Sequence, residues 1–179
     1  MKFLIVYATT DGQTRKIARF CCDRLVDSGH SAELLPAADA DAVDLTRFQG
    51  AVVAGSLHAG GFQKALRQFV ADRARALTKL PTLFLPVSLS AAGSDRDDWQ
   101  GLEKCVADFL AETRWTPGRT VHVAGAFRFT EYDFFRSWAM RRIAAEKGET
   151  VDPRADKEYT DWAALGATLD KWAAGIAAH

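Results

Sequence analysis

The chain has 179 residues, of which 48% are hydrophobic and 26% charged, and it carries 23 basic and 23 acidic side chains. This length and composition predict one globular domain with a substantial core. The zero formal net charge argues against nucleic-acid binding and against a strongly acidic electron carrier. The three cysteines, Cys21, Cys22 and Cys105, form no CxxC pair. We therefore expect no disulfide framework and no zinc site, and we place the protein in a reducing compartment, the cytoplasm.

Short apolar runs alternate with segments of helical periodicity along the chain. We predict strands over the apolar runs 3–8, 31–35, 51–54, 82–87 and 121–127. We predict helices over 14–28, 63–77, 99–113 and 160–176, with a short helix and loops over 37–49. Most of the strand candidates are continuously apolar, as strands covered on both faces are. The N-terminal apolar run stops after about six residues, which indicates a strand rather than a signal peptide.

This alternation predicts an α/β fold, a flavodoxin-like three-layer sandwich in which a five-stranded parallel sheet has the order 2-1-3-4-5. We treat residues 1–179 as a single domain. Residues from about 128 to 159 lie between the fifth predicted strand and the last predicted helix and belong to neither. They are too rich in aromatic side chains for a disordered linker, so we expect an ordered insertion. No window of the chain reaches the roughly 18 apolar residues of a membrane span.

The loop after the first strand has the composition of a phosphate site. It consists of Thr9, Thr10, Asp11, Gly12, Gln13 and Thr14 and leads directly into the first predicted helix. Backbone N–H groups at a helix N-terminus face an anion, and hydroxyl groups add donors. The alternative is an ordinary helix start capped by Thr10 or Asp11. If phosphate binds here, the Asp11 carboxylate must point away from it.

Two further loops follow the third and fourth strands. The second loop consists of Ser56, Leu57, His58, Ala59, Gly60 and Gly61. Its adjacent glycines allow backbone to approach a flat ligand closely, and His58 either contacts a flavin ring or is an exposed loop histidine. The third loop consists of Ser88, Leu89, Ser90, Ala91, Ala92 and Gly93. Its small side chains leave room for the other side of the ring or form an ordinary strand-to-helix turn.

Three such loops on one sheet edge favour FMN over an empty edge, because ligands of open α/β sheets bind at the carboxyl ends of the strands. The flavin would carry the redox chemistry, so we assign no catalytic side chain. The other three histidines, His30, His122 and His179, show no metal-ligand spacing, and we predict no metal.

Several motifs of the chain resemble one bacterial enzyme family. These are residues 7–18 with the run Asp11-Gly12-Gln13-Thr14-Arg15, residues 55–57 with Gly60, residues 124–129, residues 147–150, and Tyr159-Thr160-Asp161-Trp162. Together they are similar to the flavodoxin-like, quinone-dependent protoporphyrinogen IX dehydrogenases of haem synthesis, and the similarity runs over essentially the whole chain. The chain differs from the family pattern at His58-Ala59, where arginine and tyrosine are usual, and at the mostly acidic residues 95–98.

The resemblance implies an FMN oxidoreductase that converts protoporphyrinogen IX to protoporphyrin IX and passes the electrons to a membrane quinone. It also implies that the insertion contacts the substrate or the membrane surface, as a peripheral protein on the cytoplasmic face of the inner membrane. The residues concerned are Arg128, Phe134, Phe135, Arg136, Trp138, Arg141 and Arg142. Apolar and cationic side chains suit an interfacial helix, and the arginines equally suit porphyrinogen propionates.

Four alternatives remain open. The insertion aromatics would instead pack onto the domain, or they would supply a homo-oligomer interface. The chain would instead be a flavodoxin-type single-electron carrier, or an NAD(P)H-quinone reductase on the same fold.

Overall fold

The computed structural model describes residues 1–58, 60–127 and 157–178. Ala59 and most of the predicted insertion lie outside the described residues. The same holds for the residues that we expect to contact the substrate or the membrane, namely Arg128, Phe134, Phe135, Arg136, Trp138, Arg141 and Arg142.

A parallel sheet forms the centre of the fold, with the predicted strand order. Strands β1 (Lys2–Ala8), β2 (Ser31–Pro36), β3 (Gly50–Ser56), β4 (Thr82–Ser88) and β5 (Arg119–Thr120) are ordered β2-β1-β3-β4-β5. A sixth short strand, β6 (Val123–Ala124), also pairs with β4. All of these pairings are parallel. The flavodoxin-like order is therefore confirmed.

The apolar run 121–127 predicts one continuous fifth strand, but the structure has two short strands here, β5 and β6. Val121 N and Gly125 N donate to Phe84 O and Ser88 O of β4, each at 2.9 Å. Pro86 lies midway between these two acceptors on β4 and has no N–H to donate, so the ladder is interrupted there. The chain then leaves the sheet as β7 (Ala126–Phe127), which pairs antiparallel with β8 (Lys157–Glu158). The return strand β8 thus begins within the range that we assigned to the insertion.

The predicted helices are present with shifted ends. They are α1 (Gln13–Asp27), α2 (Lys64–Lys79), α3 (Arg96–Thr113) and α5 (Trp162–Ala177). Helix α3 begins three residues earlier than expected because the Asp95 side chain accepts hydrogen bonds from the N–H groups of Asp97 and Asp98. Residues 37–49 hold two short 3₁₀ turns, η1 (Ala37–Asp39) and η2 (Leu45–Arg47), in place of the predicted short helix.

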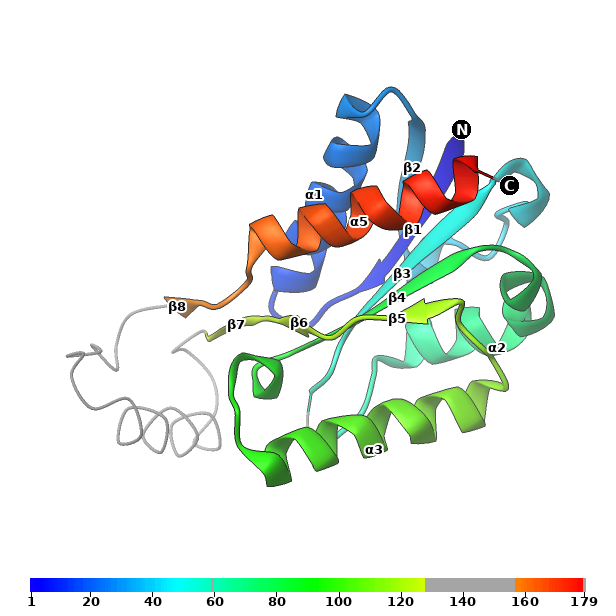
Figure 1. The fold of residues 1–179 in the computed structure, drawn as a ribbon. Coiled ribbons are helices and arrows are strands. Elements are labelled where there is room, and N and C mark those ends of the chain that lie inside the picture. Colours follow the sequence, from blue (N-terminus) through cyan, green and yellow to red (C-terminus); the bar gives the residue numbers. More distant parts are fainter. Residues whose placement is uncertain (59, 128–156, 179) are drawn as a thin grey trace.

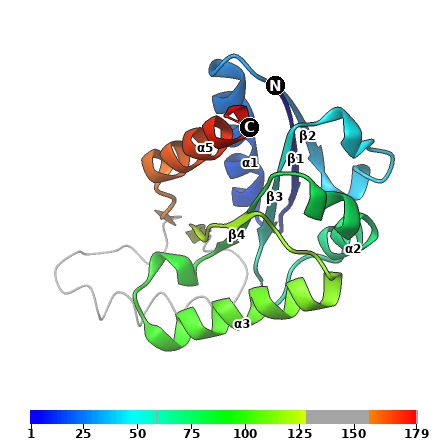
Figure 2. The same ribbon diagram turned by 45° about the vertical axis from the view of Figure 1, so that its right-hand side comes forward.

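Helices α1 and α5 cover one face of the sheet, and α2 and α3 cover the other (Figures 1 and 2). Successive side chains of β1 enter the two cores in turn: Phe3 and Ile5 pack with α1 and α5, whereas Leu4 and Val6 pack with α2 and α3. All four are fully buried. Burial on both faces explains why the strands read as continuous apolar runs. No helix within the described ranges is both long and apolar enough to cross a bilayer.

Close packing between α2 and the sheet depends on Gly55 in β3. A Cβ atom added at Gly55 would lie 2.4 Å from Cδ2 of Leu66 and 2.7 Å from Cδ1 of Phe62. Phe62 also contacts the Phe109 ring at a centroid distance of 4.6 Å. The core therefore fixes the chain on both sides of the second loop, at Gly55 and at Phe62. Cys21 is fully buried against the opposite face of the sheet, as expected for a packing residue.

Candidate functional site

The three predicted loops follow three neighbouring strands. Strand β1 pairs with β3 and β3 pairs with β4, with Ala8 opposite Gly55 and Ser56 opposite Val87. Because the strands are parallel, their carboxyl ends meet at one edge of the sheet. The fold thus brings the first, second and third loops together, as the sequence predicts.

Helix α1 begins without a side-chain cap from the described part of the chain. Its N-cap is Gly12, which has the left-handed φ of 86°, so neither Thr10 nor Asp11 caps the helix. Asp11 is exposed, and the first turn of α1 carries no acidic residue. By contrast, α3 and α5 are capped by Asp95 and Asp161. The first N–H groups of α1 and the positive end of its dipole therefore suit an anion.

The first loop is held in place by neighbouring side chains. Gly12 N donates to the hydroxyl of Thr9 at 2.9 Å. Nε2 of Gln63, the N-cap residue of α2, donates to the hydroxyl of Thr10 at 2.9 Å and so joins the first loop to the start of α2. Oε1 of Gln63 is buried and has no hydrogen-bond partner among the described residues. Gln63 was not among the predicted site residues, since it is the first residue of the predicted helix over 63–77. The unpaired acceptor beside the Thr10 hydroxyl suits a polyhydroxyl chain as ligand.

The second loop is a tight turn. His58 N donates to Gly61 O and Gly61 N donates to His58 O, both at 3.0 Å. Gly60 has a φ of 82°, and a Cβ atom added at Gly60 or Gly61 would meet nothing within 4 Å. Leu57 N donates to Val87 O at 2.8 Å, which ties the loop to β4. The glycines leave open space at the turn, and His58 is half-buried there.

The third loop folds into a 3₁₀ turn, η3 (Ser90–Ala92). Ala91 N donates to the Ser88 hydroxyl at 3.2 Å. Nε1 of Trp99 donates to Gly93 O at 2.7 Å and ties the end of the loop to α3. The segment from Leu89 to Gly93 is half-buried, so small side chains line this part of the sheet edge.

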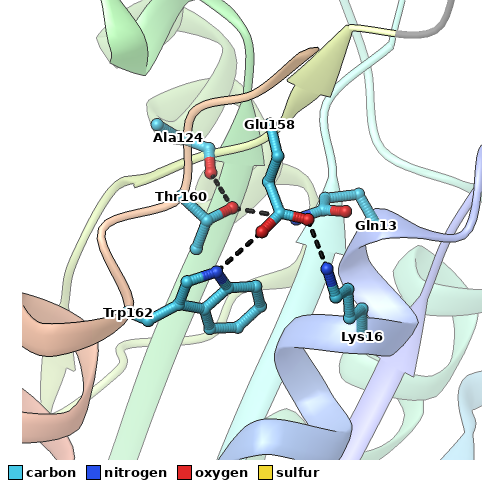
Figure 3. Close-up of polar contacts among 6 residues, drawn as sticks. All are labelled: Gln13, Lys16, Ala124, Glu158, Thr160 and Trp162. Atoms are coloured by element: carbon cyan, nitrogen blue, oxygen red, sulfur yellow. Dashed lines mark hydrogen bonds and ion pairs between the residues drawn. The ribbon is translucent and has the colours of Figure 1, made fainter. Parts of the chain in front are cut away.

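A fourth segment joins the site, from β8 to the start of α5. Thr160 accepts a hydrogen bond from Nε2 of Gln13 at 2.9 Å and donates one to Ala124 O at 2.7 Å (Figure 3). Glu158 pairs with Nζ of Lys16 at 2.5 Å and accepts from Nε1 of Trp162 at 2.7 Å. The Lys16 ammonium, together with the other donors, holds the pKa of Glu158 below its usual value. We did not predict these contacts as site contacts, although the motif at residues 159–162 marked the segment.

A cavity of about 180 Å³ lies behind the third loop, between β6 and α5. Its polar lining comes from His122, Asp161 and Thr168, and Ala91 of the third loop borders it. Burial lowers the pKa of His122, and its Nδ1 atom finds no partner among the described residues. The part of the chain that the structure describes contains no cluster of three or more potential metal ligands.

Comparison with known proteins connects this architecture to flavin proteins. A family profile described as a flavodoxin domain matches residues 4–153. The protoporphyrinogen IX dehydrogenase (quinone) of Escherichia coli K12 is 29% identical over 162 residues, which cover 90% of this chain and 89% of that protein. The protein of the same name from Leishmania major is 27% identical over 165 residues, covering 92% of this chain and 71% of that protein.

Solved structures show the same fold at lower identity. A flavodoxin from Streptococcus pneumoniae TIGR4 superposes with a TM-score of 0.59 and 17% identity, covering 98% of this chain and 99% of that chain. A cysteine-to-serine mutant of a Pseudomonas aeruginosa flavodoxin gives a TM-score of 0.52 and 21% identity, covering 83% of this chain and 100% of that chain. These likenesses confirm the flavodoxin-like arrangement of strands and helices.

Proposed function

Because this chain belongs to the flavodoxin-domain family, we propose that it binds FMN and oxidises protoporphyrinogen IX to protoporphyrin IX, with a membrane quinone as electron acceptor. The observation that carries the FMN assignment is the uncapped α1 N-terminus at the sheet edge where the three loops meet. The substrate and the acceptor are proposed from the relatives named protoporphyrinogen IX dehydrogenase (quinone), which match 90% or more of the chain.

The residues present fit the phosphate of FMN. The backbone N–H groups of Gln13, Thr14 and Arg15 begin α1 without a capping side chain from the described residues, and they would donate to phosphate oxygens. The exposed Asp11 leaves its carboxylate free to stay in solvent. The buried Oε1 of Gln63 is an acceptor within reach of the first two loops, which suits the ribityl hydroxyls.

The second and third loops would hold the ring. The open turn at Gly60 and Gly61 admits a flat group close to the backbone. The small residues of the third loop would face it from the β4 side, and we keep His58 as the side chain that contacts the flavin. Bound FMN supplies two-electron redox chemistry. The protein's part is to orient the ring and to exclude water from it.

The overall reaction balances when one protoporphyrinogen IX loses six hydrogen atoms and three quinones each gain two. No side chain is assigned to remove the substrate N–H proton. We propose that the insertion supplies the contact to the substrate or to the membrane surface, through the arginines and aromatic residues between Arg128 and Arg142. The location that follows from this proposal is the cytoplasm, at the inner face of the membrane.

Steady-state turnover tests the proposed function. Purified protein loaded with FMN is mixed with protoporphyrinogen IX and a quinone, and porphyrin fluorescence is followed without oxygen. The proposal predicts growth of fluorescence that requires both FMN and the quinone. Deleting residues 134–143 is expected to lower this turnover or membrane association while FMN stays bound.

Two outcomes would favour other functions. Rapid bleaching of the flavin by NAD(P)H, with no response to protoporphyrinogen IX, would indicate an NAD(P)H-quinone reductase. If the flavin is reduced in two well-separated one-electron steps and does not react with protoporphyrinogen IX, the protein would be a single-electron carrier.

A further inference from the structure

The segment that returns from the insertion makes buried contacts with the start of α1. Figure 3 shows Thr160 between Gln13 of α1 and the main chain of β6 at Ala124. The Gln13 and Thr160 residues are only 7% and 9% exposed. They lie 147 residues apart in the sequence, so the contact exists only when the return segment is docked.

Gln13 is the first residue of the uncapped helix, and its side-chain amide reaches Thr160 of the return segment. A flexible glutamine at this position has an amide oxygen that competes for the first N–H groups of α1. The hydrogen bond from Gln13 Nε2 to Thr160 holds the side-chain amide, so that its oxygen does not compete for these N–H groups. The backbone N–H groups of the first turn then stay available for an anion.

Thr160 is itself fixed on two sides. Its hydroxyl donates to Ala124 O of β6, and the next residue, Asp161, caps α5 through Ala164 N at 2.9 Å. The hydroxyl hydrogen is therefore used toward the strand, and the oxygen lone pairs face Gln13. The sheet thus holds Gln13 through a chain of two hydrogen bonds.

The other contact of the same segment differs in burial. The Lys16–Glu158 pair is 61% and 31% exposed, and exposed ion pairs contribute little to structure. Glu158 also interacts with the Gln13 side chain, which helps to lower the pKa of the Glu158 carboxyl, so the return segment meets Gln13 through both Glu158 and Thr160.

We propose that Thr160 is a positioning residue for the phosphate site, which holds Gln13 so that the N-terminus of α1 keeps its backbone donors directed at the phosphate of FMN. The inference rests on the proposed FMN function. It assigns the return segment a role in flavin selectivity: the segment strengthens binding of FMN over riboflavin, which has the same ring and ribityl chain and no phosphate.

The test compares both flavins in several variants of the full-length apoprotein, with dissociation constants from quenching of flavin fluorescence. Thr160→Val keeps the shape of the side chain and removes both hydrogen bonds. We expect the Kd for FMN to rise about tenfold, as for one lost buried hydrogen bond, while the Kd for riboflavin stays unchanged. Thr160→Ser restores the hydroxyl and is expected to restore FMN affinity.

Two controls separate positioning from general destabilisation. Thr113→Val makes the same change at a buried threonine of α3, whose hydroxyl donates to Phe109 O at 2.8 Å, and Asp170→Asn removes the exposed ion pair between Arg24 of α1 and Asp170 of α5. Neither is expected to change the ratio of the two Kd values. If Thr160→Val does not fold, Thr160→Ala removes the same two hydrogen bonds with a smaller side chain. Gln13→Leu removes the competing amide itself, so the double variant Gln13→Leu/Thr160→Val should bind FMN as tightly as Gln13→Leu alone.

The outcomes distinguish this inference from the function on which it rests. If the unmodified protein binds FMN and Thr160→Val binds it equally well, the positioning role is wrong and the FMN function stands. If Thr160→Val weakens riboflavin as much as FMN, the residue acts on the whole fold and the inference is overturned. If the unmodified protein binds neither flavin, the proposed function itself fails.

Discussion

Replacing Gly12 by alanine tests whether the left-handed N-cap of α1 shapes the phosphate site. Gly12 has a φ of 86°, and its N–H donates to the Thr9 hydroxyl while its O accepts from Lys16 N at 3.1 Å. An L side chain in this region costs roughly 1–2 kcal/mol. The free protein can relieve that strain by moving the exposed first loop. Binding of the phosphate would then have to restore the loop.

The expected result is a weaker complex. If the whole strain energy appears in binding, the Kd for FMN rises about 5- to 30-fold. Relaxation of the free loop keeps the loss of thermal stability small, at most about 2–8 °C in Tm for a chain of this size. Titration of the apoprotein with FMN and thermal unfolding of the same samples measure both effects.

Gly29 supplies a matched control at the other end of α1. Its φ is 82°, and a Cβ atom added there would meet nothing within 4 Å. Gly29→Ala therefore introduces the same strain of about 1–2 kcal/mol away from the loops, and it should lower Tm without changing FMN affinity. An equal loss of affinity in both variants, or an unchanged Kd in Gly12→Ala, would refute the reasoning.

Three further predictions concern packing and titration. Gly55→Ala places a Cβ atom 2.4 Å from Leu66, so unfolding experiments should show a loss of about 1–3 kcal/mol; an unchanged Tm would mean that α2 moves without cost. Burial raises the pKa of Cys21 to about 12, so mass spectrometry should find Cys21 alkylated only after unfolding, and early modification would contradict this burial. The pKa of His122 is lower in the folded chain than in the unfolded chain. As the pH falls, the unfolded chain therefore binds a proton at His122 before the folded chain does. Its contribution to stability is present above the unfolded pKa of about 6.5 and is lost as the pH falls toward the folded value. Tm measured from pH 8 to pH 5 should fall less in His122→Phe than in the unmodified protein, and identical slopes would exclude His122 as the cause.

Much of the fold was predictable because local patterns and burial agree. Buried parallel strands require continuous apolar runs, and the runs at residues 3–8 and 82–87 correspond to β1 and β4. The break in the fifth strand followed from Pro86 on its neighbour, an effect that becomes visible only when the pairing is known. The early start of α3 was readable in principle, because Asp95 is a strong N-cap residue.

The candidate site was predictable in outline and not in its contacts. Loop positions follow from strand order, so the three loops could be placed at one edge from sequence alone. The bond between Gln13 and Thr160 joins residues 147 positions apart, and no local pattern encodes such a pair. The link from Gln63 to Thr10 was missed for the same reason. The sequence also left open whether a side chain caps α1, and the backbone conformation of Gly12 answers that question.

The most direct test of the central claim is anaerobic mixing of the FMN-loaded protein with protoporphyrinogen IX, with the flavin absorption spectrum recorded over time. The account predicts that the oxidised flavin bands bleach as porphyrin fluorescence appears, with one porphyrin formed for roughly three flavins reduced, and that added quinone restores the bands. A flavin that stays oxidised in the presence of protoporphyrinogen IX would contradict the proposed reaction.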